Sequence, residues 1–220
     1  MEFNHGTELL ELCEKNKMPI SLAMKKREAE FSGITEEKVE KKMRKAWKIM
    51  KESARKPLEH PVPSIGGLIG GEAKKLKEYH EKGRSVCGGL MSRAITYAMA
   101  VLEVNASMGV IVAAPTAGSS GVVPGVLLAL QEEYELSDEE ILNGLYTAGA
   151  VGYLLMRNAS VAGAEAGCQA EVGAASAMAA AAAVEIMGGT PEMCMNAASG
   201  ALANLLGLVC DPIAGLVEAP

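Results

Sequence analysis

Aromatic residues make up only 4% of this 220-residue sequence, although 49% of its residues are hydrophobic. Alanine, glycine and methionine supply much of the apolar content, and a core of such small side chains requires backbones that approach closely. Long runs of alternating polar and apolar residues are also missing, and only the short run 110–113 is typical of a strand. The sequence therefore predicts an all-α fold, a compact helical domain with an Ala/Gly/Met core and glycine-rich loops.

Lysine is absent after Lys82, and Arg84, Arg93 and Arg157 are the only basic residues beyond it. The net charge of −6 therefore comes from an acidic second part that follows a basic first part. An acidic surface without a basic cluster argues against nucleic acid as a partner. The same absence argues against pyridoxal phosphate, because that cofactor needs a lysine to form its Schiff base.

The five cysteines are an odd number, form no CxxC pair and follow no signal peptide, which predicts reduced thiols and a cytoplasmic location. Several stretches without charge, such as 104–131, are long enough to span a membrane. They contain prolines, asparagines and many glycines, however, and lack aromatic belts and flanking basic residues. We therefore expect no membrane segment.

Prolines and glycines concentrate in residues 57–72, which predicts a loop and an organisational boundary. We divide the chain there into a charged helical segment, 1–59, and a helical catalytic domain, 60–220. Helical spacing of Val39, Met43, Ala46, Trp47 and Met50 indicates a packing face. Helices are expected over 7–17, 35–56, 73–82, 88–107 and 174–187, and from starts near 123, 137 and 190.

Three of these starts carry capping signals. Thr35 suits an N-cap before Glu36 and Glu37, and Ser137 with Glu140 forms a capping box. Thr190 is followed by Pro191, and Pro124 suits the first position of the helix near 123, where a missing N–H costs nothing.

The first candidate site is the loop of residues 114–121, directly before the helix expected near 123. Small residues leave backbone N–H groups reachable, and a helix start favours negative charge, so this loop suits a carboxylate or a phosphate. Hydroxyls of Thr116, Ser119 and Ser120 add donors. An ordinary capping turn has the same composition, and no GK[ST] follows to make a nucleotide-binding loop.

The second and third candidates surround Cys168 and Cys210. Cys168 lies between Glu165 and Glu171 in a small-residue segment, and a cysteine beside glycines is accessible to a ligand or a metal, although a buried structural thiol is the alternative. The two cysteines are 42 positions apart, which by itself is a weak metal signal because ferredoxin-type clusters use close cysteine runs. All three histidines precede residue 83, so a Cys–His pair is not expected, and neither GxSxG nor HExxH occurs.

Taken together, three segments resemble the alpha-type domain of bacterial iron–sulfur L-serine dehydratases, in the same order and spacing. They are PTAGSSGVVPG (115–125), NASVAGAEAGCQAEVGAASAMAAAA (158–182) and GLVCDPIAGLVEAP (207–220). The shorter segments PSIGGLIGGEA, SVCGGLMSRA and EVNASMG support the match. The resemblance is close over residues 60–220 and general over 1–59.

This resemblance implies a lyase that converts L-serine to pyruvate and ammonia with a 4Fe–4S cluster held by three cysteines. One iron stays open and acts as a Lewis acid on the hydroxyl of serine. Cys168 and Cys210 match two ligands, and the third is expected directly after Pro220, so the chain as given should hold a cluster poorly. Cys13, Cys87 and Cys194 match no ligand, and we expect them to be structural, with Cys13 exposed.

The resemblance also implies a substrate site and partners. The loop Thr116, Ala117, Gly118, Ser119, Ser120 is expected to hold the carboxylate of serine, with Asn158, Ser160 and Glu165 as further polar groups. A separate beta chain is expected to supply a motif containing serine and histidine, and with it the general base, in an oligomer. Alternatives are a related iron–sulfur β-elimination on L-cysteine or L-threonine, or a helical scaffold or membrane module without catalysis.

Overall fold

The computed structural model describes residues 1–83 and 85–207, and every regular element in these ranges is an α-helix. The all-α prediction is therefore confirmed, and residues 110–113 form irregular chain instead of a strand. The helices are α1 (Gly6–Asn16), α2 (Ile20–Ser32), α3 (Glu36–Glu59), α4 (Glu72–Glu81), α5 (Gly88–Ala106), α6 (Val122–Glu133), α7 (Asp138–Asn158), α8 (Gly163–Ile186) and α9 (Pro191–Leu205).

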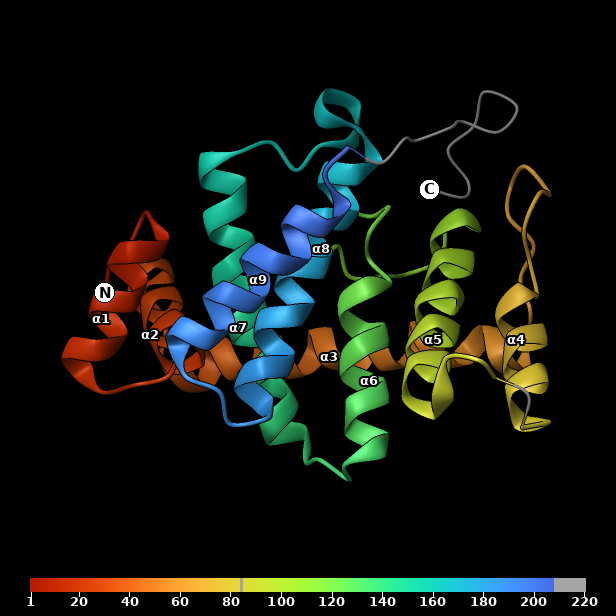
Figure 1. Ribbon diagram of the computed structural model, residues 1–220, viewed down its shortest axis with the longest axis horizontal. Helices are drawn as coiled ribbons and strands as arrows, with labels where there is room; N and C mark the ends of the chain where they lie inside the picture. The colour runs from red at the N-terminus through yellow and green to blue at the C-terminus, as the bar shows by residue number, and fades with distance from the viewer. Residues whose placement is uncertain (84, 208–220) are drawn as a thin grey trace.

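The long helix α3 runs across the back of the molecule and links its two ends (Figure 1). Helices α1 and α2 lie at one end, α4 lies at the other, and α5 to α9 stand between them in front of α3 (Figure 1). The main packing pairs are α8 with α9, α7 with α8, and α5 with α6, and α3 contacts α5. The loop between α5 and α6 consequently lies close to the start of α8, because α6 also packs against α8.

Small residues make the contact between α7 and α8, as the composition predicted. Alanines fill the buried face of α8, and Gly144 and Gly152 of α7 lie directly against Ile186 and Met178 of α8. A Cβ atom built on Gly144 would lie 2.5 Å from Cδ1 of Ile186. The two helices therefore approach more closely than larger side chains would allow.

Most helix ends agree with the signals in the sequence. Thr35 and Thr190 cap α3 and α9, and Ser137 with Glu140 forms the capping box of α7. Three expectations were wrong. Helix α8 begins at Gly163 and not near Ala174, with a break at Gly167. Helix α3 continues through Pro57 to Glu59, because a proline in the last turn removes only one hydrogen bond. Helix α6 begins at Val122, which makes Pro124 its third residue, where the N–H would also lack a helical partner.

The sequence reasoning did not anticipate helix α2, which is weakly amphipathic and depends on tertiary contacts. Glu185 of α8 accepts hydrogen bonds from the backbone N–H of Ser21, in the first turn of α2, and from the hydroxyl of Thr147. A carboxylate from a distant helix thus stabilises the start of α2, since negative charge is favourable at a helix N-terminus.

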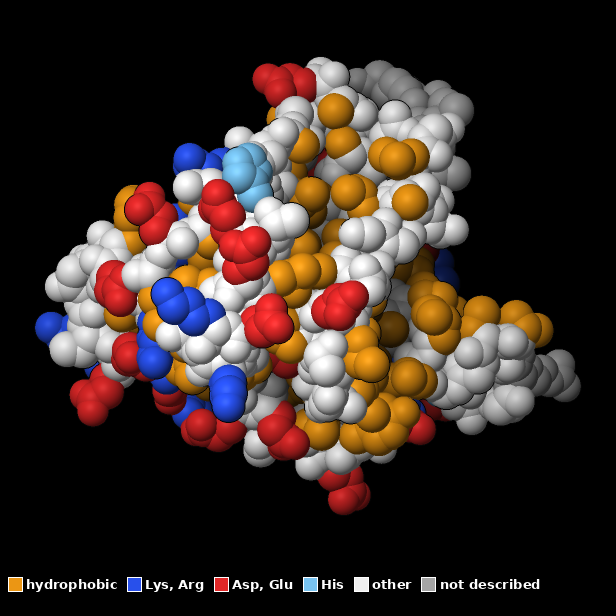
Figure 2. All heavy atoms as spheres, turned by 60° about the vertical axis from the view of Figure 1, so that its left-hand side comes forward, with side chains coloured by type: hydrophobic (Ala, Val, Ile, Leu, Met, Phe, Trp, Pro, Cys, Tyr) orange, Lys and Arg blue, Asp and Glu red, His pale blue; other side chains and the backbone are white. Residues whose placement is uncertain are grey.

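One hydrophobic core includes residues from both sides of the boundary that we place at 59/60, from Phe3 and Trp47 to Val123, Leu145 and Ala181. The division into two segments stays a prediction. On the face shown in Figure 2, Lys and Arg side chains lie mostly on one half, whereas hydrophobic side chains dominate the other. None of the helices in the described ranges is long and apolar enough to cross a bilayer.

Asp138 is predicted to contribute stability that is lost in acid. Hydrogen bonds from Gln131, Lys51 and Trp47 lower the pKa of its carboxyl to about 2, from an ordinary value of 3.8. The stabilisation is therefore complete above about pH 4 and disappears as the pH falls towards 2. We expect Asp138→Asn to lower the free energy of unfolding by about 1 kcal/mol at pH 7, because a half-exposed carboxylate is partly screened by solvent.

The measurement is urea unfolding of both proteins between pH 2 and pH 7. The difference in the free energy of unfolding between wild type and Asp138→Asn should shrink below pH 4. The control Glu78→Gln changes an exposed carboxylate on α4, and its free energy of unfolding should follow that of wild type at every pH. A difference in the free energy of unfolding between wild type and Asp138→Asn that stays constant down to pH 2 would contradict stabilisation by the ionised carboxylate of Asp138.

Candidate active site

The loop of residues 114–121 is fixed by a direct backbone contact between its end and helix α5. A Cβ atom on Gly121 would lie 2.4 Å from the carbonyl oxygen of Ala98, and one on Gly125 would lie 2.7 Å from the carbonyl oxygen of Ala94. Only glycine permits such an approach without a shift of the backbone. The loop, which contains a cis peptide bond between Ala114 and Pro115, therefore has a defined position at the start of α6.

The hydroxyl groups of this loop form a partly buried cluster. The Thr116 and Ser119 hydroxyls lie 2.9 Å apart, and the carbonyl oxygen of Ala114 accepts a long hydrogen bond from Ser119. Ser120 is only 1% exposed, and its Oγ has no hydrogen-bond partner among the described residues. A buried hydroxyl without a partner is costly in a folded protein, so its presence at a helix start fits a site that receives a polar ligand.

Glu171 of α8 joins this loop. Its carboxylate accepts a hydrogen bond from the Thr116 hydroxyl. Two glycines leave room for the carboxylate, because a Cβ on Gly118 would lie 2.7 Å from its Oε1 and a Cβ on Gly163 would lie 2.8 Å from its Oε2. The sequence reasoning noted Glu171 only as a neighbour of Cys168. The sequence did contain a signal for this contact, namely Gly118 in the segment 115–125 and Gly163 in the segment 158–182.

Cys168 lies in the first turn of the long straight part of α8. Gly167, with φ 79° and ψ 166°, interrupts the helix immediately before it, and only glycine adopts this conformation readily. The thiol is half-buried. Glu171 is three residues further on, so both side chains belong to the same helical turn. The second predicted ligand, Cys210, lies outside the described residues.

The other described cysteines differ in exposure from the expectation. Cys13 is buried and not exposed, because α1 turns this side chain into the core, and Cys87 is the exposed one. Burial raises the pKa of Cys13 to about 11 and that of Cys194 to about 12, and the nearby Glu185 carboxylate adds to both shifts. Both thiols therefore stay protonated at neutral pH, which makes them poor nucleophiles and poor ligands.

Asn158 and Ser160 form hydrogen bonds outside the loop 114–121. The side-chain amide of Asn158 donates to the carbonyl oxygens of Asn4 and Leu154, and the Ser160 hydroxyl donates to Glu165. Within residues 1–83 and 85–207, neither side chain shares a hydrogen bond with the loop 114–121. The structure thus brings Thr116, Ser119 and Glu171 together, whereas the predicted roles of Asn158 and Ser160 in binding substrate stay predictions.

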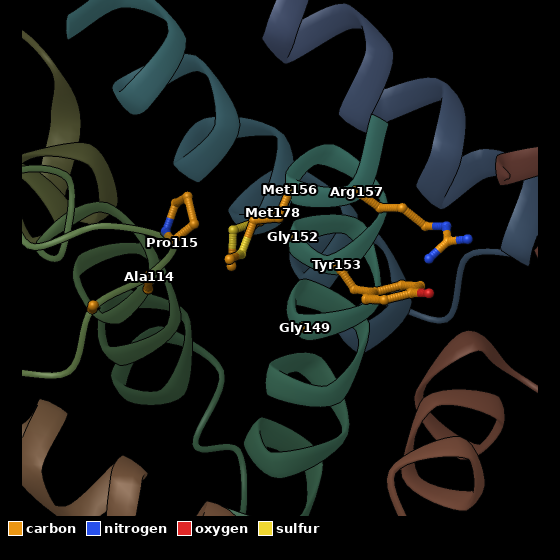
Figure 3. Close-up of a pocket in the computed structure, with 9 residues that line it drawn as sticks. Ala114, Pro115, Gly149, Gly152, Tyr153, Met156, Arg157 and Met178 are labelled. Carbon is orange, nitrogen blue, oxygen red and sulfur yellow. The ribbon is translucent and has the colours of Figure 1, made fainter. Parts of the chain in front are cut away.

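A groove of about 680 Å³ borders the same loop. Ala114 and Pro115 form one wall, and Met156 of α7 and Met178 of α8 lie opposite, whereas Tyr153 and Arg157 point away from the loop (Figure 3). The guanidinium of Arg157 is exposed to solvent, which screens its charge without an ion-pair partner. The groove gives a small polar molecule a mostly apolar path to the loop.

The site therefore combines a hydroxyl-lined loop at a helix start, a carboxylate and a thiol at a second helix start. No group of three or more His, Cys, Asp or Glu side chains suited to a metal ion is found within the described part of the chain. This arrangement defines a class of helical proteins with a hydroxyl-lined loop, a carboxylate and a half-buried thiol close together.

Comparison with known proteins identifies the family within this class. Residues 9–220 match the family described as serine dehydratase alpha chain. The chain is 47% identical over 218 residues to the probable L-serine dehydratase alpha chain of Bacillus subtilis. The aligned residues cover 99% of this chain and 72% of that protein. It is 45% identical over 217 residues to the L-serine dehydratase alpha chain of Peptoniphilus asaccharolyticus, with 99% and 74% covered.

An L-serine dehydratase from Streptomyces coelicolor is 36% identical over 224 residues, which cover 99% of this chain and 48% of that longer protein. The match to the family extends over nearly the whole chain. The chain belongs to the serine dehydratase alpha chain family.

Proposed function

We propose that this chain is the alpha chain of an L-serine dehydratase, which converts L-serine to pyruvate and ammonia. The observation that carries the proposal is the family match over residues 9–220 together with close relatives named for this activity. The structure adds support, because the Thr116–Glu171 hydrogen bond holds the substrate loop within one helical turn of Cys168.

The chain's residues have distinct tasks in this proposal. The loop Thr116, Ala117, Gly118, Ser119, Ser120 binds and orients serine through hydroxyl and backbone donors, and the unpartnered Ser120 hydroxyl is one of these donors. Asn158 and Ser160 are proposed to contribute at the edge of the site. The apolar wall of Pro115, Met156 and Met178 limits the access of water.

Cys168 is proposed as a ligand of a 4Fe–4S cluster, with Cys210 as a second. A half-buried thiol directly after the break at Gly167 suits this group, because iron–sulfur clusters are held by cysteine side chains that they can reach. When bound, the cluster supplies a Lewis-acidic iron that assists the departure of the serine hydroxyl. A separate beta chain is proposed to complete the site and to supply the general base.

A substrate panel tests this function. The alpha chain would be assembled with its beta chain, reconstituted with iron and sulfide under anaerobic conditions, and offered L-serine, L-threonine and L-cysteine separately. We expect pyruvate from L-serine with a kcat/KM at least about 10-fold higher than for the other two. L-Cysteine lacks the hydroxyl that the site binds, and the additional methyl group of L-threonine must fit a site sized for serine. Preferred turnover of L-cysteine would replace this function with the related β-elimination.

A further inference from the structure

Glu171 is a carboxylate beside the loop 114–121, and it has no cationic partner among residues 1–83 and 85–207. None of the ion pairs formed by the described residues includes it. Of the three basic residues that follow Lys82, Arg93 pairs with Glu133, and Arg157 points away from the loop (Figure 3). A cationic group that approached this partly exposed carboxylate would form a charge-assisted hydrogen bond with it.

Two glycines and a hydroxyl surround the carboxylate, and the Glu171 side chain stays partly exposed. Gly118 and Gly163 place backbone and no side chain beside its two oxygens. Thr116 donates to Oε1 and holds the group in place, while Ser119 supports Thr116 from within the loop. A carboxylate oxygen accepts more than one hydrogen bond, so Oε1 and Oε2 keep acceptor capacity for further donors.

We propose that Glu171 binds the α-ammonium group of the substrate and thereby selects amino acids over hydroxy acids of the same length. This inference rests on the proposed function and adds a residue role to it. The ammonium supplies the missing positive charge and up to three donors. Because Glu171 repels a second carboxylate, the carboxylate of the substrate lies towards the other end of the loop, at Ser120 and the start of α6, where the helix dipole is favourable.

The test compares two ligands that differ in the ammonium group alone, L-serine and 3-hydroxypropanoate, in the assembled and reconstituted enzyme. In Glu171→Gln we expect the KM for L-serine to rise about 10- to 100-fold, because a hydrogen bond between charged groups is lost. The kcat should change less than about threefold, since the interaction is the same before and during the reaction. Binding of 3-hydroxypropanoate, measured by calorimetry and by competitive inhibition, should stay equal or become tighter.

Two variants control for damage to the fold. Glu171→Asp keeps the charge and should retain most of the preference for L-serine, whereas Glu192→Gln, which removes an exposed carboxylate from the first turn of α9, should leave both ligands unaffected. The visible absorbance of the cluster reports in each case whether the site is assembled.

Three results would overturn the inference. Equal weakening of both ligands in Glu171→Gln would show that Glu171 only orders the loop. A loss of kcat at constant KM would make it a group that acts on the reaction and not on binding. A wild-type enzyme that forms no pyruvate would overturn the proposed function, and with it this inference, whereas the first two results leave the function intact.

Discussion

Replacing Cys168 with serine is expected to abolish cluster assembly and to lower the rate of pyruvate formation by at least about 1000-fold. The size of the effect follows from the role proposed for the metal, since Lewis-acid assistance contributes several kcal/mol and each 1.36 kcal/mol is a tenfold change in rate. A serine hydroxyl is a far weaker ligand for iron than a thiolate. The structure predicts little change in folding, because Cys168 is half-buried at a helix start and not part of the main core.

Iron and sulfide content, cluster absorbance and pyruvate formation would be measured on the assembled enzyme, with circular dichroism as the check on folding. Cys87→Ser is the matched control, because Cys87 is an exposed cysteine next to the start of α5 that matches no ligand of the family motif. It should keep the full cluster content and full activity. A Cys168→Ser enzyme that retained both would remove Cys168 from the ligand set.

Gly121→Ala is expected to destabilise the protein by about 2–3 kcal/mol. The new methyl group would lie 2.4 Å from the carbonyl oxygen of Ala98, and an overpacked contact of this kind costs roughly 1–3 kcal/mol even when neighbours adjust. Backbone adjusts less easily than a side chain, so we place the effect in the upper part of that range. Because the same contact fixes the loop 114–121, the variant should also bind substrate less tightly.

The control is Gly200→Ala on α9. Nothing lies within 4 Å of a Cβ atom at this position, so alanine should raise the free energy of unfolding by about 0.5–1 kcal/mol through its higher helix propensity. Urea unfolding midpoints of the two variants should thus move in opposite directions. If Gly121→Ala matched or exceeded wild type in stability, α5 and α6 would not be in direct backbone contact.

Local signals in the sequence determined the helices and most of their ends. Alanine-rich composition, the hydroxyl at Ser137 and the Thr190–Pro191 pair act within one or two helical turns, so a reader of the sequence can evaluate them without knowing the fold. Helix α2 could not be predicted in this way, because its start is stabilised by Glu185, which is 164 positions away from Ser21 along the chain.

The sequence by itself also determined the family, since long motifs around Thr116 and Cys168 carry the resemblance that the comparisons confirmed. Only the tertiary structure decided how these motifs meet. Packing of α6 against both α5 and α8 brings Thr116 and Glu171 into hydrogen-bond contact although they are 55 positions apart. The physical reason is that Gly118 and Gly163 matter because they lie against Glu171, and Gly121 because it lies against the backbone of Ala98. These neighbours are distant in the sequence and come into contact only when the helices pack.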